Sequence, residues 1–195
     1  MMEATSTADR IIAAAERRMR EGGFRGFSFR DIAADVGIKS ASVHHHFPTK
    51  EDLAAAVARA YTERYLKELG DPDNPERDPA ELIAHYVDRS RRALVEDRRM
   101  CLCCVLATEA AALPPALNAE ARKFFERNLA WIETVLARLS PDTRTDDRKA
   151  EALRIAATLD GAMLIAHSLG DLSAFESVAQ RLRETLPLGS STSAG

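Results

Sequence analysis

Signals that begin and end helices are closely spaced between residues 28 and 53, and they constrain the fold more than any other feature of this chain. Ser28 and Asp31 have the spacing of a capping box, in which each side chain satisfies the backbone N–H of the other residue, so a helix is predicted to begin there. Gly37 is predicted to end this helix in a left-handed conformation that turns the chain sharply. A second short helix follows and is predicted to stop at Pro48. The segment therefore encodes two short helices around a tight turn.

A third helix is predicted to begin directly after this pair. Thr49 and Asp52 repeat the capping-box spacing, and the helix is expected to run from Glu51 to Leu69. Lys50 stands at its start, where a basic side chain beside unsatisfied backbone N–H groups is suited to hold a phosphate. A further amphipathic helix, capped at Ser6, precedes the segment. The first part of the chain is therefore expected to form a small helical unit.

The second short helix has few apolar residues to bury. Val43 and Phe47 lie one helical turn apart and define its inward side. The other side chains are small or polar, and such a face suits a DNA groove, because Ser and His hydrogen-bond base edges and Ala contacts the thymine methyl group. Together with the capping residues and the lysine of the next helix, the predicted DNA contacts are Ser28, Lys39, Ser40, Ala41, Ser42, His44, His45, Thr49 and Lys50.

The run IAADVGIKSASVHHHFPTKEDL, preceded by TADRIIAAAERRMREGG, resembles the DNA-binding domain of the TetR family of bacterial transcriptional regulators. One position departs from the family's pattern, because His44 stands where the family usually has a Tyr whose hydroxyl contacts a phosphate; an imidazole N–H is able to replace it. The resemblance covers about the first quarter of the chain. The positions that match the family are Ile32, Ala33, Gly37, Ile38, Val43, Phe47, Lys50 and Leu53.

The resemblance and the composition predict the same fold class. Aromatic residues make up only 6% of the chain, β-branched residues are sparse, and no segment alternates with the period of a strand. The protein is therefore expected to be all-α, with about nine helices. The resemblance implies a helix-turn-helix DNA-binding domain over residues 6–55 and a larger helical effector-binding and dimerisation domain over residues 56–187. Residues 188–195 are expected to form a disordered tail.

Charge is distributed unevenly along the chain. The formal net charge is −3, yet the segment from Arg17 to Lys50 holds seven basic and three acidic residues, a net charge of +4, which leaves −7 elsewhere. A basic head on an acidic body is able to steer toward phosphate. The alternative is that these charged residues only form solvent-exposed helix faces and bind no partner.

Later segments predict further long helices. A Pro- and Asp-rich loop separates them from the first part of the chain. In the helix predicted over 146–169, small residues are interleaved with leucines, which suits close helix packing within one chain or between two. The resemblance favours the second, because TetR-like proteins form homodimers through their two C-terminal helices and bind palindromic operators. The predicted helices are 79–96, 100–112, 116–139, 146–169 and 172–186.

The three cysteines Cys101, Cys103 and Cys104 form a CLCC run. One hypothesis is a metal- or redox-responsive regulator, with His85 or His167 as added metal ligands. The alternative is that the thiols are small buried apolar groups in a reducing compartment. The histidine triplet is not expected to bind metal, because neighbouring helical side chains point about 100° apart. No metal site and no cofactor is therefore predicted.

A small-molecule effector site is implied by the resemblance, since TetR-like regulators usually repress and leave DNA when a ligand binds. Aromatic and polar residues lie on the helices that would surround such a site, although each also fits ordinary core packing. The candidates are His85, Tyr86, Met100, Cys104, Phe124, Asn128, Trp131, Met163 and His167.

Other function classes find less support. The sequence has no GxSxG, P-loop, HExxH or GxGxxG motif, so an enzyme is not predicted. Its start lacks the pattern of a signal peptide, and the longest apolar run identified is residues 100–107. The expected protein is a cytoplasmic homodimer that binds double-stranded DNA and a small molecule, with no membrane partner.

Overall fold

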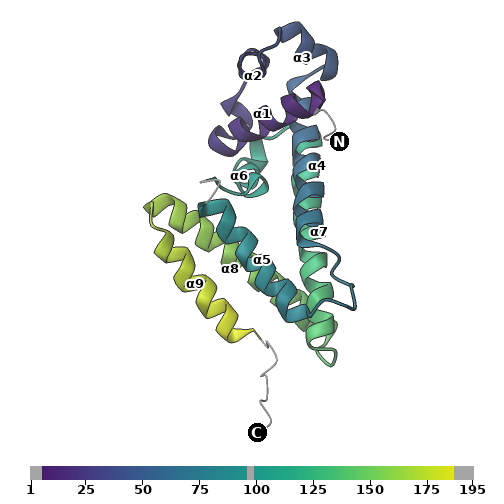
Figure 1. Cartoon of the computed structure of the whole chain (residues 1–195), viewed down its shortest axis with the longest axis vertical. Coiled ribbons are helices and arrows are strands. Elements are labelled where there is room, and N and C mark those ends of the chain that lie inside the picture. The colour runs from purple at the N-terminus through teal and green to yellow at the C-terminus, as the bar shows by residue number, and fades with distance from the viewer. Residues whose placement is uncertain (1–5, 96–98, 187–195) are drawn as a thin grey trace. The chain divides into compact units, whose positions relative to one another are not determined.

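A computed structural model describes residues 6–95 and 99–186 (Figure 1). Within these ranges the protein contains nine α-helices, two short 3-10 helices and no strand, which confirms the predicted all-α class. Contacts divide the chain into two compact units, Met1–Tyr65 with Cys101–Phe125, and Leu66–Met100 with Glu126–Gly195. The first unit thus includes a segment from the middle of the chain, and the predicted division at residue 55 stays a prediction.

The first unit begins with α1 (Thr7–Gly22), which starts directly after the predicted cap, Ser6. The Ser6 hydroxyl accepts the Asp9 N–H at 3.1 Å and forms the expected capping box. The helix ends at Gly23, whose φ of 66° lies in the region that favours glycine. One face of α1 is buried against the helices that follow, through Ile11, Ala14, Ala15 and Met19.

The helix pair α2 (Phe29–Val36) and α3 (Ser40–His46) follows the sequence prediction closely. Ser28 caps α2 together with Asp31, and Gly37 has a left-handed φ of 73° at the turn. Val43 is fully buried, whereas Phe47, predicted on the same inward side, is half-buried. The short inward side of α3 thus leaves most of this helix exposed.

Three more helices contribute to the first unit: α4 (Lys50–Leu69) up to Tyr65, α6 (Leu102–Thr108), and α7 (Pro115–Leu139) up to Phe125. Rings from α4 and α7 pack together, with 5.0 Å between the centroids of Tyr65 and Phe124. The prediction of one helix over 100–112 was wrong. α6 stops at Thr108, Glu109 leaves α-helical geometry with ψ near 6°, and a separate 3-10 turn, η2, covers Ala110–Ala112.

The second unit contains α5 (Pro79–Val95), α8 (Thr145–Leu169) and α9 (Leu172–Thr185), with the C-terminal part of α7. Gly170, with a left-handed φ of 64°, ends α8 and lets α9 fold back against it. The predicted end of α5 at residue 96 and the predicted tail, residues 188–195, lie outside the described residues. Buried apolar side chains of this unit include Leu82, Ile83, Ile155, Leu159 and Phe175.

Helix α8 is apolar on two opposite faces. Its buried face includes Ile155, Leu159 and Met163, while large apolar residues project on the other face. By length and composition alone this helix could cross a membrane, although residues 100–107 remain the longest uninterrupted apolar run of the chain. A soluble core helix passes the same test, so its length and composition are weak evidence for a membrane. The exposed residues are Leu153, Leu164, Ile165 and Leu169.

Candidate nucleic-acid interface

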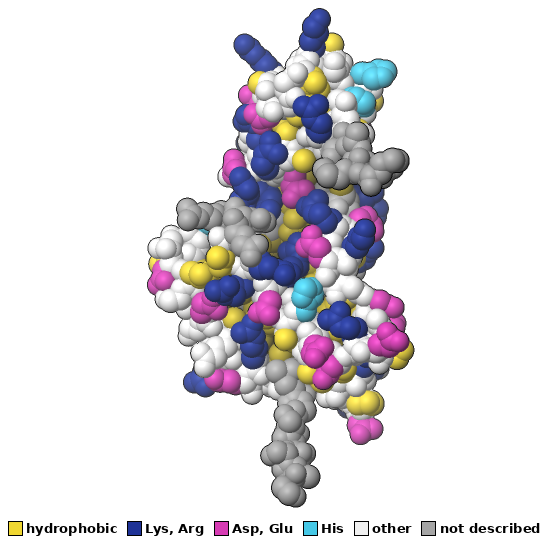
Figure 2. Space-filling view, viewed as in Figure 1, with side chains coloured by type: hydrophobic (Ala, Val, Ile, Leu, Met, Phe, Trp, Pro, Cys, Tyr) yellow, Lys and Arg dark blue, Asp and Glu magenta, His cyan; other side chains and the backbone are white. Residues whose placement is uncertain are grey.

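The outer face of α3 carries most of the predicted DNA contacts. Figure 2 shows Lys, Arg and His side chains over the part of the first unit where Figure 1 draws α2 and α3. A helix whose polar side chains are exposed while one valine anchors it is able to enter a major groove. Of the predicted contacts, Ser40, Ser42 and Lys50 are half-buried, and the exposed ones are Ser28, Lys39, Ala41, His44, His45 and Thr49.

The ring of His44 is held in place although it is exposed. It packs edge-on against Phe29, with 4.5 Å between ring centroids and 70° between ring planes. Phe29 is itself buried in the first turn of α2. The imidazole therefore occupies the position of the family's Tyr with a restricted orientation, which reduces the entropy lost if it binds a phosphate.

The two capping hydroxyls are already engaged. Ser28 Oγ donates to Asp31 Oδ2 at 2.6 Å, and Thr49 Oγ1 donates to Asp52 Oδ2 at 2.7 Å. The Ser28 hydrogen bonds lower the pKa of Asp31. Each hydroxyl already donates its proton to the carboxylate of the capping box. Ser28 and Thr49 can therefore contact DNA only through the lone pairs of the hydroxyl oxygen or through neighbouring backbone N–H groups.

Two arginines of α1 hold α1 and α2 together. Arg18 forms a bidentate ion pair with Asp35, at 2.6 and 2.9 Å, and this hydrogen bonding lowers the pKa of Asp35. Arg10 Nη2 donates to the carbonyl of Val36 at 2.6 Å, near the end of α2. These side chains fix α1 against α2. Because Arg18 is paired with Asp35, the count of seven basic residues in the segment overstates the cations available to DNA.

Other cations of the basic segment remain available to DNA. Arg25, Arg30 and Lys39 are exposed, and within residues 6–95 and 99–186 none of them pairs with a carboxylate. Only Lys39 was among the residues predicted to contact DNA; Arg25 and Arg30 were counted only in the charge of the basic segment. Their signal in the sequence was the basic segment itself, which does not distinguish a cation that pairs within the protein from one that does not.

Lys50 is placed differently from the solvated cations. It is half-buried, and its Nζ lies 4.7 Å from the ring centroid of Phe24 and 4.6 Å from that of Phe27. Burial lowers the pKa of Lys50, against the opposing fields of nearby carboxylates. Contact with two aromatic faces stabilises the ammonium there. The predicted phosphate contact of Lys50 stays a prediction.

Among the described residues, the three cysteines are not assembled with other ligands into a metal site. Cys101 and Cys103 are buried, Cys104 is half-buried, and no disulfide joins them. In the described part of the chain, no three His, Cys, Asp or Glu side chains come together as a metal site would require. A redox response of these thiols stays a hypothesis.

The predicted effector residues are brought together only in part. In the second unit, Trp131 stacks on Tyr86 with 5.8 Å between ring centroids, and Asn128 Nδ2 donates to Tyr86 Oη at 2.9 Å. His85 Nε2 is hydrogen-bonded with the carbonyl of Glu68, and His167 is exposed on α8. Met100 and Met163 are buried in the second unit, whereas Cys104 and Phe124 belong to the first.

Taken together, two short helices joined by a left-handed glycine, with an exposed polar face on the second, define a helix-turn-helix DNA-binding protein. The family model for bacterial regulatory proteins of the tetR family matches residues 11–57. A TetR transcriptional regulator from Legionella pneumophila, whose structure is solved, is 32% identical, with 94% of this chain and 99% of that chain covered and a TM-score of 0.87. The chain belongs to the TetR family.

Other relatives agree with this assignment. A TetR-family regulator from Agrobacterium tumefaciens, also of known structure, is 31% identical, with 91% of this chain and 95% of that chain covered and a TM-score of 0.83. The transcriptional regulator CymR of Pseudomonas putida is 29% identical, over 73% of this chain and 72% of its own length. The protein is therefore a DNA-binding transcriptional regulator, and its family is not one of enzymes.

Proposed function

We propose that the protein is a repressor that binds a palindromic operator as a homodimer and is released by a small-molecule effector. The observation that carries the DNA-binding part is the exposed polar face of α3, presented by a capped and salt-bridged head. Ser40, Ser42 and His45 are the candidate base contacts, and Lys39, Arg25 and Arg30 are candidate phosphate contacts. A regulator of chromosomal genes acts in the cytoplasm, and we propose that location for this one.

Selection of bound DNA from random duplexes tests the proposal. The expected product is a palindrome with half-sites one helical turn or a multiple of a turn apart. Replacing His45 by Ala should change the selected sequence, whereas replacing Arg30 by Ala should weaken binding to all duplexes and lower the salt slope by about one. A selection that returns no common sequence would contradict operator recognition.

We propose dimerisation through α8 and α9. The exposed apolar residues Leu153, Leu164, Ile165 and Leu169 form a face of α8 that no residue of the described chain covers. Gly161 lies on the same face, and a Cβ added there would meet no atom within 4 Å. A glycine in the middle of a helix costs about 1 kcal/mol relative to alanine. Its presence there suits the close approach of a second helix.

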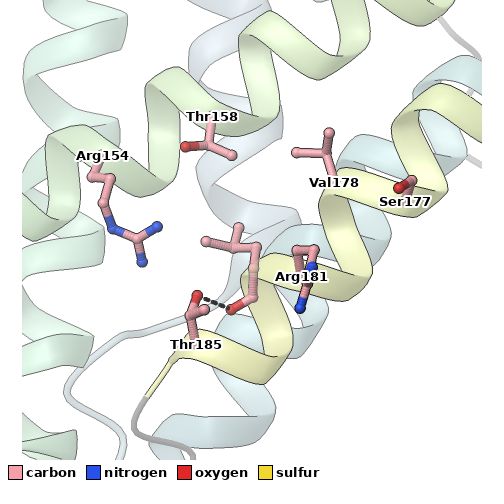
Figure 3. Close-up of a pocket in the computed structure, with 7 residues that line it drawn as sticks. Arg154, Thr158, Ser177, Val178, Arg181 and Thr185 are labelled. Atoms are coloured by element: carbon pink, nitrogen blue, oxygen red, sulfur yellow. Dashed lines mark hydrogen bonds between the residues drawn. The ribbon is translucent and has the colours of Figure 1, made fainter.

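A shallow cavity adjoins this face. It has a volume of about 240 Å³, and Figure 3 shows Arg154 and Thr158 of α8 projecting toward α9. Thr158 follows Arg154 by one helical turn on the side of α8 that carries Ile165 and Leu169. We assign this cavity to the dimer surface, to be filled by partner side chains. Its lining is completed by Ser177, Val178, Arg181, Leu182 and Thr185.

For the effector, the group formed by Tyr86, Asn128 and Trp131 is the best supported site. The indole N–H of Trp131 is satisfied by the Gly70 carbonyl at 2.8 Å, yet Asn128 Oδ1 is buried without a hydrogen-bond partner in the structure. An unmet buried acceptor costs about 1–3 kcal/mol. If the amide is rotated, Nδ2 takes the unmet position instead, and a hydroxyl group serves either orientation. We therefore propose an uncharged, hydroxyl-bearing effector.

The single tryptophan of the chain makes this testable. Adding phenols or alcohols should change Trp131 fluorescence and release operator DNA, while the matching methyl ethers should bind more weakly. Asn128→Leu should abolish that preference for the hydroxyl compounds. Equal responses to alcohols and ethers would contradict the assignment of Asn128, and operator release by any of them would still support an effector-controlled repressor.

A further inference from the structure

A glutamate from outside the helix-turn-helix holds the turn between α1 and α2. Glu109 follows the last residue of α6, and its Oε2 accepts the backbone N–H of Phe24 at 3.0 Å. Phe24 begins the short 3-10 helix η1 (Phe24–Gly26), directly after the end of α1. Both residues belong to the first compact unit. The carboxylate thus binds a backbone donor that α1 and η1 leave unsatisfied.

The chain makes room for this carboxylate at Gly23. A Cβ at this position would lie 2.2 Å from Glu109 Oε1 and 2.7 Å from its Cδ, which is closer than nonbonded atoms approach. Gly23 also has a φ of 66°, a conformation that a side chain disfavours. Two properties of the glycine, its missing side chain and its backbone conformation, therefore permit the contact.

Lys50 completes the arrangement from α4. Its ammonium lies over the rings of Phe24 and Phe27, the residues on either side of the η1 turn. Glu109 is among the carboxylates whose field favours the charged form of Lys50. The turn is thus held by a carboxylate on its backbone and a cation on its rings. Phe27 is buried and directly precedes Ser28, the cap of α2, so the turn fixes where the helix pair begins.

We propose that Glu109 and Lys50 are positioning residues for DNA binding, which hold the turn from Gly23 to Phe27 so that α2 and α3 meet DNA in one orientation. This inference rests on DNA binding by the head and assigns Lys50 a role through protein contacts, in place of a phosphate contact. It also makes α6, through Glu109, an element on which the presentation of α3 depends.

Operator affinity at several salt concentrations tests the proposal. Glu109→Ala should weaken operator binding about tenfold, as expected for a lost charge-assisted hydrogen bond, while Glu109→Gln should stay within about twofold because its amide oxygen accepts the same N–H. Lys50→Ala should weaken binding with an unchanged slope of log affinity against log salt. Arg30→Ala, the matched phosphate contact, should lower that slope by about one. Glu126→Gln, an exposed glutamate of α7, is the neutral control.

Two results would overturn the proposal: unchanged operator affinity in Glu109→Ala, or a salt slope that falls by about one in Lys50→Ala. Amide hydrogen exchange gives a second measurement that does not need DNA. The Phe24 N–H should exchange slowly in the wild type and in Glu109→Gln, and at least tenfold faster in Glu109→Ala. Fast exchange of Phe24 in the wild type would also overturn it. If the wild type binds no DNA, operator recognition fails, while the exchange measurement still decides whether Glu109 holds the turn.

Discussion

At the scale of single residues, short-range hydrogen bonds decide where the helices of the head begin. The pairs Ser6–Asp9, Ser28–Asp31 and Thr49–Asp52 each join residues three positions apart, and all three form the reciprocal bonds of a capping box. Such pairs could be predicted from sequence because both partners lie within one helical turn. Glu109 and Phe24 are 85 positions apart, and only the folded chain brings them together. Because of that separation, no local sequence pattern predicts the contact.

His44 offers a test at the same scale. Replacing it by Tyr, the usual residue of the family at this position, should strengthen operator binding about fivefold, because a hydrogen bond from a hydroxyl to phosphate adds about 1 kcal/mol. The contact with Phe29 should persist, since a phenol ring also packs edge-on against it. Fluorescence anisotropy with labelled operator measures the affinity. His46→Tyr is the control on the same helix, and an equal gain in both variants would mean that position 44 has no special role.

At the scale of elements, apolar spacing and caps predicted where most helices lie, but not where α6 ends. The segment 100–112 contains neither Gly nor Pro, so no strong local breaker marks the end of the helix at Glu109. Its side chain instead bonds to the backbone of Phe24, a tertiary contact that the local pattern does not contain. The candidate DNA-binding site was likewise predicted only in part. The exposed face of α3 followed from local pattern, whereas the placement of Lys50 over two rings did not.

The ion pair between α1 and α2 makes head stability depend on pH. Asp35 has a lowered pKa because Arg18 hydrogen-bonds its carboxylate. A lowered folded-state pKa means that the stabilisation is complete above the unfolded-state value of about 3.9 and is lost as pH falls through the folded-state value. Asp35→Asn should therefore lower the unfolding free energy at pH 7, and the difference from wild type should shrink as pH falls below the unfolded-state value. Urea unfolding measures this, with Glu126→Gln as the control. A difference that stays constant with pH would exclude the ion pair as its cause.

At the scale of the whole molecule, α8 requires an explanation that one chain does not supply. Its inner face is buried by its own unit, and its outer face exposes Leu153, Leu164, Ile165 and Leu169. A helix with large apolar residues on two opposite faces is expected where both faces are covered. A two-fold partner would cover this face and would also match a palindromic operator. The sequence showed the small and large residues of α8 but left open which of them face inward, because its apolar residues occupy both faces.

Substitutions at Gly161 distinguish an effect on the stability of α8 from an effect on dimerisation. Gly161→Ala should stabilise isolated α8 by up to about 1 kcal/mol, because alanine favours helix and its Cβ meets no atom of the same chain. If a second α8 approaches here, Gly161→Leu should convert the protein to monomer by blocking that approach, while helix content stays unchanged. Sedimentation equilibrium measures the oligomeric state and circular dichroism the helix content, and Ala130→Leu, at an exposed position on α7, is the matched control.

The monomeric variant should bind a single half-site as the wild type does. It should lose the added affinity for the full palindrome, since that gain comes from linking two DNA-binding domains. A dimeric Gly161→Leu variant with full palindrome affinity would place the partner surface elsewhere.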